Sequence, residues 1–305
     1  MEKIRRNLFP LTNKDHVTQV SGLLLRIRDM TAYDLFRGKK GDYMSYQYIL
    51  TEERDGIYIV TLNRPEAKNA INSAMWLELC QAFDHLEQTD SLRVGIITNV
   101  GDCFCAGSDL KEIAAGTYHE PEGYEKSGFA GMCKRYIKKP LIAAANGRVL
   151  GGGVEVVVAC DLAIAGTDSE FSLPEPRRGL TAAGGGLLMR IMQIMPAKPA
   201  MELMLTCEPF SAKKAEECFL INKAVEPGTV LDEAIKMAEF ICKGAPLAIE
   251  CTKRTAYETM GENVVYPSKG WEILEEIEKI TQTSEDKIEG ATAFAEKREP
   301  VWKGR

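Results

Sequence analysis

Three short, largely apolar segments most constrain what this chain can fold into. They span residues 94–98, 141–145 and 161–165, and helical segments separate them. A strand that is apolar on both faces is typical of a sheet covered on both sides. Strand–helix–strand alternation over residues 94–165 indicates crossover connections. We therefore predict an α/β fold built on a largely parallel sheet.

Two further elements are predicted before this alternation. Residues 48–53 and 57–63 alternate in polarity and are joined by Arg54-Asp55-Gly56, which indicates a β-hairpin. A helix is expected to run from Ser73 to Gln88, with Ser73 as its N-cap. The apolar stripe of this helix is predicted to comprise Ala74, Leu77, Leu79, Ala82, Phe83 and Leu86.

The rest of the chain is predicted to be mostly helical. A loop over residues 116–127 is expected to lead into a helix that ends at Lys138. Beyond Gly186 strands nearly vanish, and helices follow each other with short links. The expected helices span residues 186–195, 197–206, 211–218, 229–243, 246–260, 269–281 and 284–297.

These patterns divide the chain into three predicted regions. Residues 1–45 carry mixed charges with weak periodicity, so we expect a poorly ordered N-terminal extension. A weak targeting sequence, or translation upstream of a working start at Met44, are the alternatives. Residues 46–245 are predicted to form the core that holds the active site, and residues 246–305 a C-terminal helical region.

Composition argues against several classes of function. The chain has 305 residues and a net charge of −6, so nucleic acid is not expected as a partner. Nine cysteines without CxxC pairing and three scattered histidines do not indicate a metal site. No apolar run approaches the ~18 residues of a membrane span, so no membrane partner is expected. Free thiols favour the cytoplasm.

A glycine-rich stretch and two carboxylates indicate chemistry. Gly151-Gly152-Gly153 precedes an apolar helical segment whose first turn contains Glu155. Burial of such an acid raises its pKa, while free N–H groups at the start of the helix can stabilise developing negative charge. Glu175 lies between two prolines and cannot be an interior helix residue, so a rigid loop must present it. The combination predicts general acid/base work on a carbonyl compound.

A structural role for each acid is the alternative. Glu155 would then cap or pair within its helix, and Glu175 would pair with Arg177 or Arg178, because structural networks also contain perturbed acids. The glycines beside the two acids together favour the functional interpretation.

Several of these residues resemble the motifs of the crotonase (enoyl-CoA hydratase/isomerase) superfamily. They are Gly151-Gly152-Gly153-Val154-Glu155, Cys160-Asp161, Leu173-Pro174-Glu175 and Phe104-Cys105-Ala106-Gly107-Ser108-Asp109-Leu110. The resemblance covers residues 46–305, and the C-terminal run from Ile288 to Arg305 resembles the branch with crotonobetainyl-CoA hydratases (carnitinyl-CoA dehydratases). It implies a crotonase-type ββα spiral core, a C-terminal helical oligomerisation region, and a homotrimer or homohexamer.

The resemblance also implies roles for individual residues. The N–H groups of Ser108 and Gly152 correspond to the oxyanion hole for a thioester oxygen. Glu155 and Glu175 correspond to the two acids that hold one water, Glu155 helping to deliver hydroxide to C3 and Glu175 exchanging the C2 proton. Both acids together favour hydration of a trans-2-enoyl-CoA, with no cofactor because CoA is part of the substrate.

The CoA contacts implied by the resemblance are Ala67, Lys68, Ala106 and Lys111, with Phe294 and Lys297 reaching the CoA of a neighbouring subunit. Without the resemblance, Lys68 and Lys111 are better explained as solvated charges and Phe294 as a core residue. Two departures leave the acyl preference open: Ser108 stands where many relatives have alanine, and Thr181-Ala182-Ala183 replaces a proline-containing segment.

Three other functions remain as alternatives. Crotonobetainyl-CoA hydration requires aromatic faces or an acid beside a quaternary ammonium, and the candidates for these groups are Tyr118, Glu120, Tyr124 and Phe129. Isomerisation of an enoyl-CoA is the second alternative, and a non-catalytic CoA-binding scaffold is the third.

Overall fold

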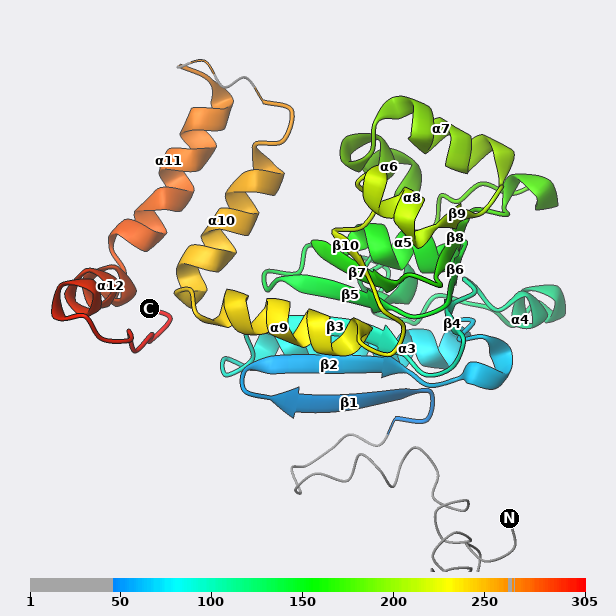
Figure 1. Ribbon diagram of the computed structural model, residues 1–305, viewed down its shortest axis with the longest axis horizontal. Coiled ribbons are helices and arrows are strands. Elements are labelled where there is room, and N and C mark those ends of the chain that lie inside the picture. The colour runs from blue at the N-terminus through cyan, green and yellow to red at the C-terminus, as the bar shows by residue number, and fades with distance from the viewer. Residues whose placement is uncertain (1–45, 263–264, 266) are drawn as a thin grey trace, which may run out of the picture. The chain divides into compact units, whose positions relative to one another are not determined.

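The computed structural model describes residues 46–262, 265 and 267–305. The N-terminal extension predicted for residues 1–45 lies outside this part. The larger sheet has the strand order β1-β2-β3-β5-β7-β10 (Figure 1). Its strands are β1 (Ile49–Arg54), β2 (Ile57–Leu62), β3 (Val94–Asn99), β5 (Leu141–Ala145), β7 (Leu162–Gly166) and β10 (Lys223–Val225). Only β1 pairs antiparallel within this sheet, so the predicted hairpin and the parallel sheet are confirmed.

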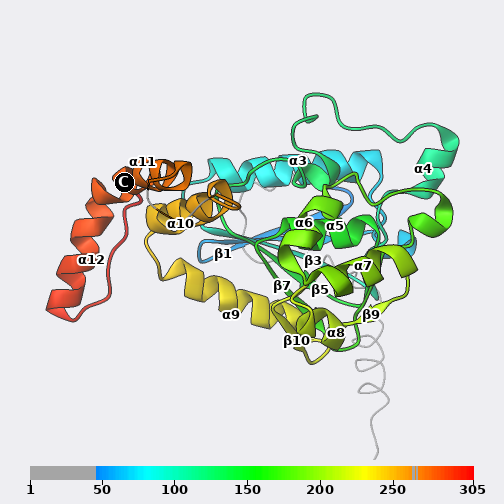
Figure 2. The same cartoon turned by 90° about the horizontal axis from the view of Figure 1, so that it is seen from above.

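Successive side chains of the large sheet enter two different cores. Ile97 and Ala143 belong to a core shared with α3 (Ser73–Gln88) and α5 (Gly152–Ala159). Their neighbours Ile96 and Ile142 belong to a second core with α9, which spans Val230–Cys242. Figure 2 shows α3 and α9 on opposite sides of the strands. Coverage on both faces explains why these strands are apolar throughout.

A second, smaller sheet was not predicted from the sequence. Its order is β4-β6-β8-β9, and β4, β6 and β8 are parallel. The strands are β4 (Cys103–Cys105), β6 (Arg148–Leu150), β8 (Glu170–Ser172) and β9 (Phe210–Ser211). Strands of two or three residues carry too little alternation to be recognised by periodicity.

The helix α3 has the predicted bounds but a different cap and a different buried face. Its N-cap is Asn72, whose side chain accepts a hydrogen bond from the Met75 N–H. The predicted cap, Ser73, instead donates its own N–H and hydroxyl to Glu112. The predicted stripe is wrong at two positions and incomplete: Ala74 and Leu77 are exposed, whereas Met75, Trp76 and Cys80 are buried.

The helix predicted to end at Lys138 is absent from the described residues between Ser127 and Pro140. Only one 3₁₀ turn, η2 (Phe129–Gly131), forms there. Gly128, Ala130 and Gly131 all have positive φ, which a right-handed helix does not contain. A Cβ on Gly131 would lie 2.7 Å from Cys80 Cα, so this turn packs its backbone directly on α3.

The remaining helices are close to the predicted ranges. They are α6 (Leu187–Ile194), α7 (Ala197–Thr206), α8 (Ala212–Glu217), α10 (Pro246–Glu258), α11 (Lys269–Gln282) and α12 (Glu285–Glu296). Three further elements are α4 (Leu110–Ala115) and the 3₁₀ turns η1 (Pro65–Ala67) and η3 (Pro176–Arg178). The division of the core from the C-terminal region between residues 245 and 246 stays a prediction.

A largely buried ion pair attaches α10 to the sheet. The Lys253 ammonium lies 2.7 Å from Asp161 Oδ2 and donates to the Lys139 carbonyl at 3.0 Å. Tyr257 donates its hydroxyl to the other oxygen of Asp161 at 2.9 Å. Because Asp161 directly precedes β7, these contacts connect α10 to the large sheet.

Candidate active site

The small parallel sheet positions three of the four predicted catalytic positions. Ser108 follows β4, Gly152 follows β6, and Glu175 follows β8. The carboxyl ends of parallel strands meet at one edge of a sheet, so these three segments lie side by side. Glu155 belongs to the same edge because it is in the first turn of α5, which begins directly after β6.

The Glu155 side chain is buried among apolar and backbone groups. The residue is 5% exposed, and its Oε1 has no hydrogen-bond partner among the described residues. Burial raises the pKa of Glu155, and the charge of Glu175 raises it further. The backbone N–H of Gly185 and the guanidinium of Arg190 act in the opposite direction. An acid with this balance can change protonation state during a reaction at neutral pH.

Glu175 directs its carboxylate toward the same glycine stretch. A Cβ on Gly151 would lie 2.6 Å from Glu175 Oε1. Burial raises the pKa of Glu175, and its Oε2 is buried without a partner in the described part of the chain. Arg177 pairs with Glu208, and Arg178 only lowers the pKa of Glu175. Neither arginine forms an ion pair with Glu175 within the described residues.

Two backbone N–H groups beside the acids are free. The Ile71 N–H donates to the Gly107 carbonyl at 2.8 Å, and the Asp109 N–H donates to the Ile71 carbonyl at 3.0 Å. Successive peptide groups of an extended segment point to opposite sides, so the Ser108 N–H faces away from Ile71. Neither it nor the Gly152 N–H donates to any group in residues 46–262, 265 or 267–305.

The glycines allow these two segments to touch. Gly107 has φ +87°, and a Cβ there would lie 2.9 Å from the Gly152 nitrogen. A Cβ on Gly153 would lie 2.3 Å from the Cys105 carbonyl oxygen. Only residues without a side chain permit such an approach. The result is a shallow cradle of backbone N–H groups suited to an oxyanion.

A buried ion pair holds the Ser108 segment. Arg64 Nη1 lies 2.6 Å from Asp109 Oδ2 and also donates to the Ala70 carbonyl. Burial opposes ionisation of Asp109, but Arg64 and the Lys111 N–H outweigh it, so the pKa of Asp109 is lowered. Asp109 is also the N-cap of α4.

Aromatic side chains form one wall of the site. Trp76 packs against Tyr118 in a tilted arrangement and against Phe129 edge to face, at ring-centroid distances of 5.7 Å each. A Cβ on Gly152 would lie 2.7 Å from the Phe129 ring, which places this wall against the cradle. Tyr118 donates its hydroxyl to Ser108 Oγ at 3.0 Å, and burial raises its pKa to about 12.

The predicted CoA contacts fall into two groups. The Ala106 N–H donates to the Lys68 carbonyl at 3.1 Å, so Ala67 and Lys68 adjoin Ala106. Lys111 is exposed on α4. Phe294, 87% exposed, and Lys297 belong to α12 and its C-cap, and Figures 1 and 2 show α12 far from α4. Within one chain, only the first group (Ala67, Lys68, Ala106 and Lys111) is therefore brought toward the acids.

Two other kinds of site are absent from the described residues. No group of three or more His, Cys, Asp or Glu side chains there is arranged to hold a metal ion. None of the helices that the structure describes has the length and apolar character to cross a bilayer.

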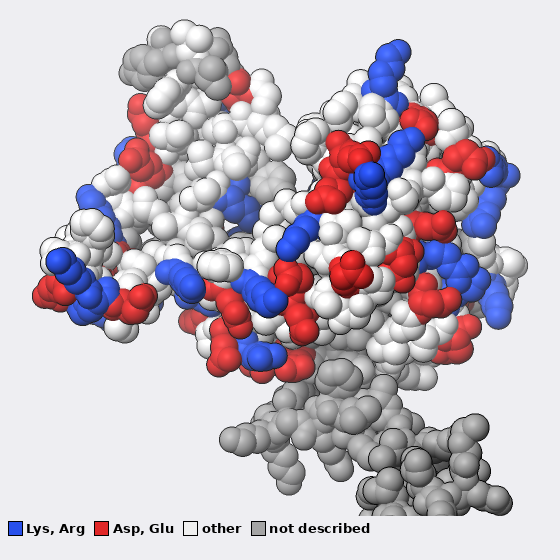
Figure 3. Space-filling model, in the orientation of Figure 1, with Lys and Arg blue, Asp and Glu red and all other residues white. Residues whose placement is uncertain are grey.

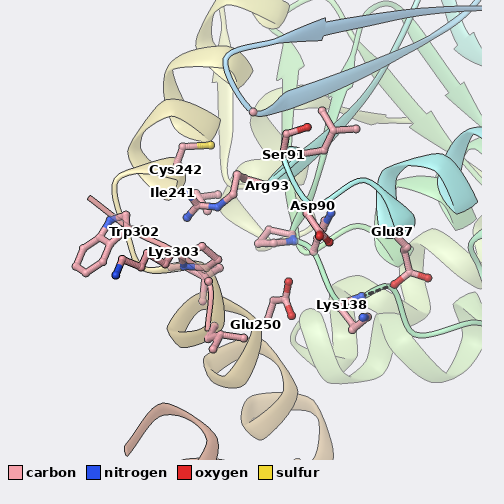
Figure 4. Close-up of a pocket in the computed structure, with 18 of the residues that line it drawn as sticks. Glu87, Asp90, Ser91, Arg93, Lys138, Ile241, Cys242, Glu250, Trp302 and Lys303 are labelled. Atoms are coloured by element: carbon pink, nitrogen blue, oxygen red, sulfur yellow. Dashed lines mark hydrogen bonds between the residues drawn. The ribbon is translucent and has the colours of Figure 1, made fainter. Parts of the chain in front are cut away.

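A cavity of about 640 Å³ lies near the amino-terminal ends of strands of the large sheet (Figure 4). Arg93 and Pro140, which line it, directly precede β3 and β5, whereas the two acids lie beyond carboxyl ends of strands. Four acidic side chains (Asp55, Glu87, Asp90, Glu250) and four basic ones (Arg93, Lys138, Lys139, Lys303) line the cavity, so it favours neither sign of charge.

Comparison with known proteins agrees with this arrangement. The enoyl-CoA hydratase/isomerase family model matches residues 52–305. A carnitinyl-CoA dehydratase of Escherichia coli is 37% identical over 251 residues, which cover 81% of this chain and 94% of that protein. A mevalonyl-coenzyme A hydratase of Beauveria bassiana is 36% identical over 259 residues, covering 81% and 91%. An enoyl-CoA hydratase structure from Mycobacterium tuberculosis superposes with a TM-score of 0.78 at 44% identity, covering 85% and 99%.

The fold and the site define a protein of the crotonase superfamily, in which a sheet edge presents backbone N–H groups beside buried acids. The chain belongs to the enoyl-CoA hydratase/isomerase family. The resemblance stated from the sequence motifs is thereby confirmed, and so is the crotonase-type fold.

Two residues of this site were not singled out from the sequence. Arg190 lies in a helix with no distinctive motif around it, and Trp76 lies between Ala74 and Leu77, which were wrongly placed on the buried face of α3. A stricter count of apolar residues at helical spacing places Met75, Leu79 and Phe83 on the buried face of α3. Only tertiary contacts reveal that Arg190 lies near Glu155.

Proposed function

We propose that this protein is an enoyl-CoA hydratase that adds water reversibly to a trans-2-enoyl-CoA thioester. The observation that carries the proposal is the pairing of Glu155 with Glu175. Each acid has a buried oxygen without a partner in the described residues, and the charge of Glu175 acts on Glu155. Two acids with raised pKa values beside free N–H groups match the needs of hydration, which moves two protons and creates a transient enolate.

The proposed mechanism divides the work between backbone and side chains. The N–H groups of Ser108 and Gly152 bind the thioester oxygen and stabilise it as the enolate forms. One such donor contributes roughly 2.7–4 kcal/mol in acyl-transfer enzymes. Glu155 accepts a proton from water while the water oxygen bonds to C3. Glu175 delivers a proton to C2 on the same face of the double bond. The proton count balances within one addition because one acid starts ionised and the other protonated. Glu155 must then return a proton to Glu175, directly or through water, before the next turnover.

Loss of crotonyl-CoA absorbance tests this proposal. We expect Glu155→Gln and Glu175→Gln to lower kcat by roughly 10²–10⁴-fold, the usual contribution of a general acid or base. Glu170→Gln, an exposed acid on β8, is the matched control and should hydrate at the wild-type rate. A wild-type protein that leaves enoyl-CoA thioesters unchanged, or acid variants that match Glu170→Gln, would contradict the assignment.

Hydration of crotonobetainyl-CoA is the second candidate. The aromatic wall of Trp76, Tyr118 and Phe129 offers ring faces to a quaternary ammonium. Glu120, in the same loop as Tyr118, has a buried Oε1 without a partner in the described region. The ratio of kcat/KM for crotonyl-CoA and crotonobetainyl-CoA decides between the two substrates, and we expect Glu120→Gln to weaken only the cationic one.

Two other activities remain to be tested against hydration. Double-bond movement without incorporation of ¹⁸O from labelled water would identify an isomerase. A CoA-dependent rise in melting temperature without turnover of any enoyl thioester would identify a binding scaffold. The retention of two acids rather than one supports hydration over both.

We further propose a homotrimer or a homohexamer in the cytoplasm. The C-terminal helices expose Ile288 and Phe294 at 68% and 87%, which supports association through α12. In Figure 3 the visible face mixes both signs of charge, while much of the surface over α10 and α11 is uncharged. In that assembly Phe294 and Lys297 would reach a neighbour's CoA. All nine cysteines are free, which supports a reducing compartment. Light scattering measures the mass of the assembly.

A further inference from the structure

Arg190 connects two backbone segments that enclose Glu155. It lies on α6, and its Nη1 donates to the Cys133 carbonyl at 2.6 Å and to the Gly185 carbonyl at 2.8 Å. Neither acceptor is a carboxylate, so the guanidinium keeps its full positive charge at this point. The side chain is half-buried, which limits screening of that charge by solvent.

The glycine segment lies between Glu155 and Cys133. A Cβ on Gly185 would lie 2.8 Å from Glu155 Cβ and 3.1 Å from Cys133 Cβ. A Cβ on Gly184 would lie 3.5 Å from Glu155 Oε2. The main chain of this glycine pair therefore covers the carboxylate without any side chain of its own. Glycine backbone has the greatest conformational freedom, so an external contact must hold it in place.

We infer that Arg190 is the positioning residue of Glu155: it holds the Gly184–Gly185 backbone against this carboxylate, and its positive charge favours the ionised form of Glu155. The inference rests on the proposed hydration, in which Glu155 receives the proton of water and Glu175 donates the proton to C2.

The other side chains around Glu155 do not favour its ionisation. Cys105 on β4, Cys133 after η2 and Tyr118 after α4 face Glu155, and burial raises the pKa of each, so all three are neutral near pH 7. Glu175, the N-cap of η3, disfavours ionisation of Glu155. The Gly185 N–H favours it, and Arg190 on α6, which also binds the Gly185 carbonyl, is left as the cation that favours it.

Glu175 has a different cationic neighbour. Arg178 is the residue whose charge lowers the pKa of Glu175, and it is exposed to solvent. A charge in water acts more weakly than a half-buried one at a similar separation. The half-buried cation therefore acts on Glu155, and the solvent-exposed cation acts on Glu175.

Carboxyl ¹³C NMR of protein labelled at glutamate tests this inference without any turnover. The Glu155 resonance is identified by its loss in Glu155→Gln. We expect Arg190→Gln to raise the titration midpoint of Glu155 by roughly one pH unit, the lower end of the effect of an adjacent opposite charge. Arg190→Lys keeps the charge and should stay close to wild type. Arg254→Gln removes an exposed arginine paired with Glu258 and should leave the midpoint unchanged.

The pH dependence of hydration supplies a second readout. The acidic limb of kcat/KM should move upward with the NMR midpoint in Arg190→Gln, so kcat/KM below that limb falls about tenfold for a shift of one unit. Arg190→Lys should restore the limb. A merely structural role would lower the melting temperature of both variants and leave the limb where it is.

The outcomes separate the two proposals. An unchanged Glu155 midpoint in folded Arg190→Gln overturns the positioning role, whatever the activity. A shifted midpoint in a protein that hydrates no enoyl-CoA supports the positioning role and refutes the hydratase assignment. If Arg190→Gln does not fold, Gly185→Ala tests the same contact, because its Cβ displaces this backbone from Glu155. An unchanged midpoint in that variant overturns the inference, and a raised one supports it.

Discussion

A single methyl group placed on Gly107 should separate the two N–H groups of the proposed oxyanion hole. Gly107 has φ +87°, and the added Cβ of Gly107→Ala would lie 2.9 Å from the Gly152 nitrogen and 3.5 Å from its Cα. Both of these atoms are main chain and cannot rotate away. Relief of the overlap therefore requires one backbone segment to move, and the Ser108 N–H follows directly after Gly107.

The cost has a conformational part and a catalytic part. Alanine at such a φ costs roughly 1–2 kcal/mol in folding stability. Gly228→Ala is the matched control because Gly228 has φ +85° and nothing within 4 Å of its added Cβ. Both variants should therefore share the conformational loss, about 2–4 °C per kcal/mol for a chain of this size. Only Gly107→Ala should also lose an oxyanion contact, which lowers kcat by roughly 10²–10³-fold.

Initial rates of crotonyl-CoA hydration and thermal unfolding of both variants measure the two parts. We expect Gly228→Ala to hydrate at the wild-type rate despite its lower melting temperature. If folded Gly107→Ala retains a kcat within a few-fold of Gly228→Ala, the close contact of Gly107 with Gly152 does not hold the oxyanion geometry and the reasoning is refuted.

Three further predictions concern the surroundings of the site. Folding raises the pKa of Glu155, so this residue's contribution to wild-type stability should fall as pH rises above the ordinary glutamate value near 4.5. Glu155→Gln should therefore unfold at a higher temperature than wild type at neutral pH but not at acid pH. Lys253→Met leaves Asp161 without its cation and should lower the free energy of unfolding in urea by about 3–5 kcal/mol, whereas a loss below about 1 kcal/mol would mean that α10 is held by other contacts. Tyr118→Phe removes the hydrogen bond to Ser108 Oγ and should change kcat by less than about tenfold, because a neutral hydrogen bond contributes roughly 0.5–1.5 kcal/mol; a larger loss would indicate that the tyrosine hydroxyl acts on the substrate itself.

The large sheet was predictable because burial on both faces leaves a strong signal. Every residue of β5 is apolar, and the residues of β3 that enter either core are apolar too. The short helix α4 was also predictable, since Asp109 caps it with a side chain whose acceptor geometry is local in sequence. Local signals of this kind need no knowledge of the tertiary fold.

The segment between Ser127 and Pro140 was mispredicted because its conformation depends on tertiary contacts. Its glycines and Ala130 adopt positive φ so that Gly131 can pack on the backbone of α3. Alanine has the highest helix propensity, and its positive φ here costs energy that packing must offset. The same limitation applies to Arg190, whose two acceptors are carbonyl groups at Cys133 and Gly185. Sequence patterns do not encode which carbonyls a side chain will meet.

The catalytic positions are brought together by the sheet that periodicity missed. Ser108, Gly152 and Glu175 each lie two or three residues beyond a strand of the small sheet, in the spatial order β4, β6, β8. Neighbouring strands are about 4.8 Å apart, so three parallel strands present their following residues across roughly 10 Å. That span matches a thioester carbonyl together with its adjacent double bond. Cys105, Leu150 and Ser172 end these strands, and their burial or close packing fixes the strand ends far more firmly than a loop would. The spacing of the motifs along the sequence therefore has physical meaning only through this sheet, and an insertion within β6 or β8 should abolish hydration before it abolishes folding.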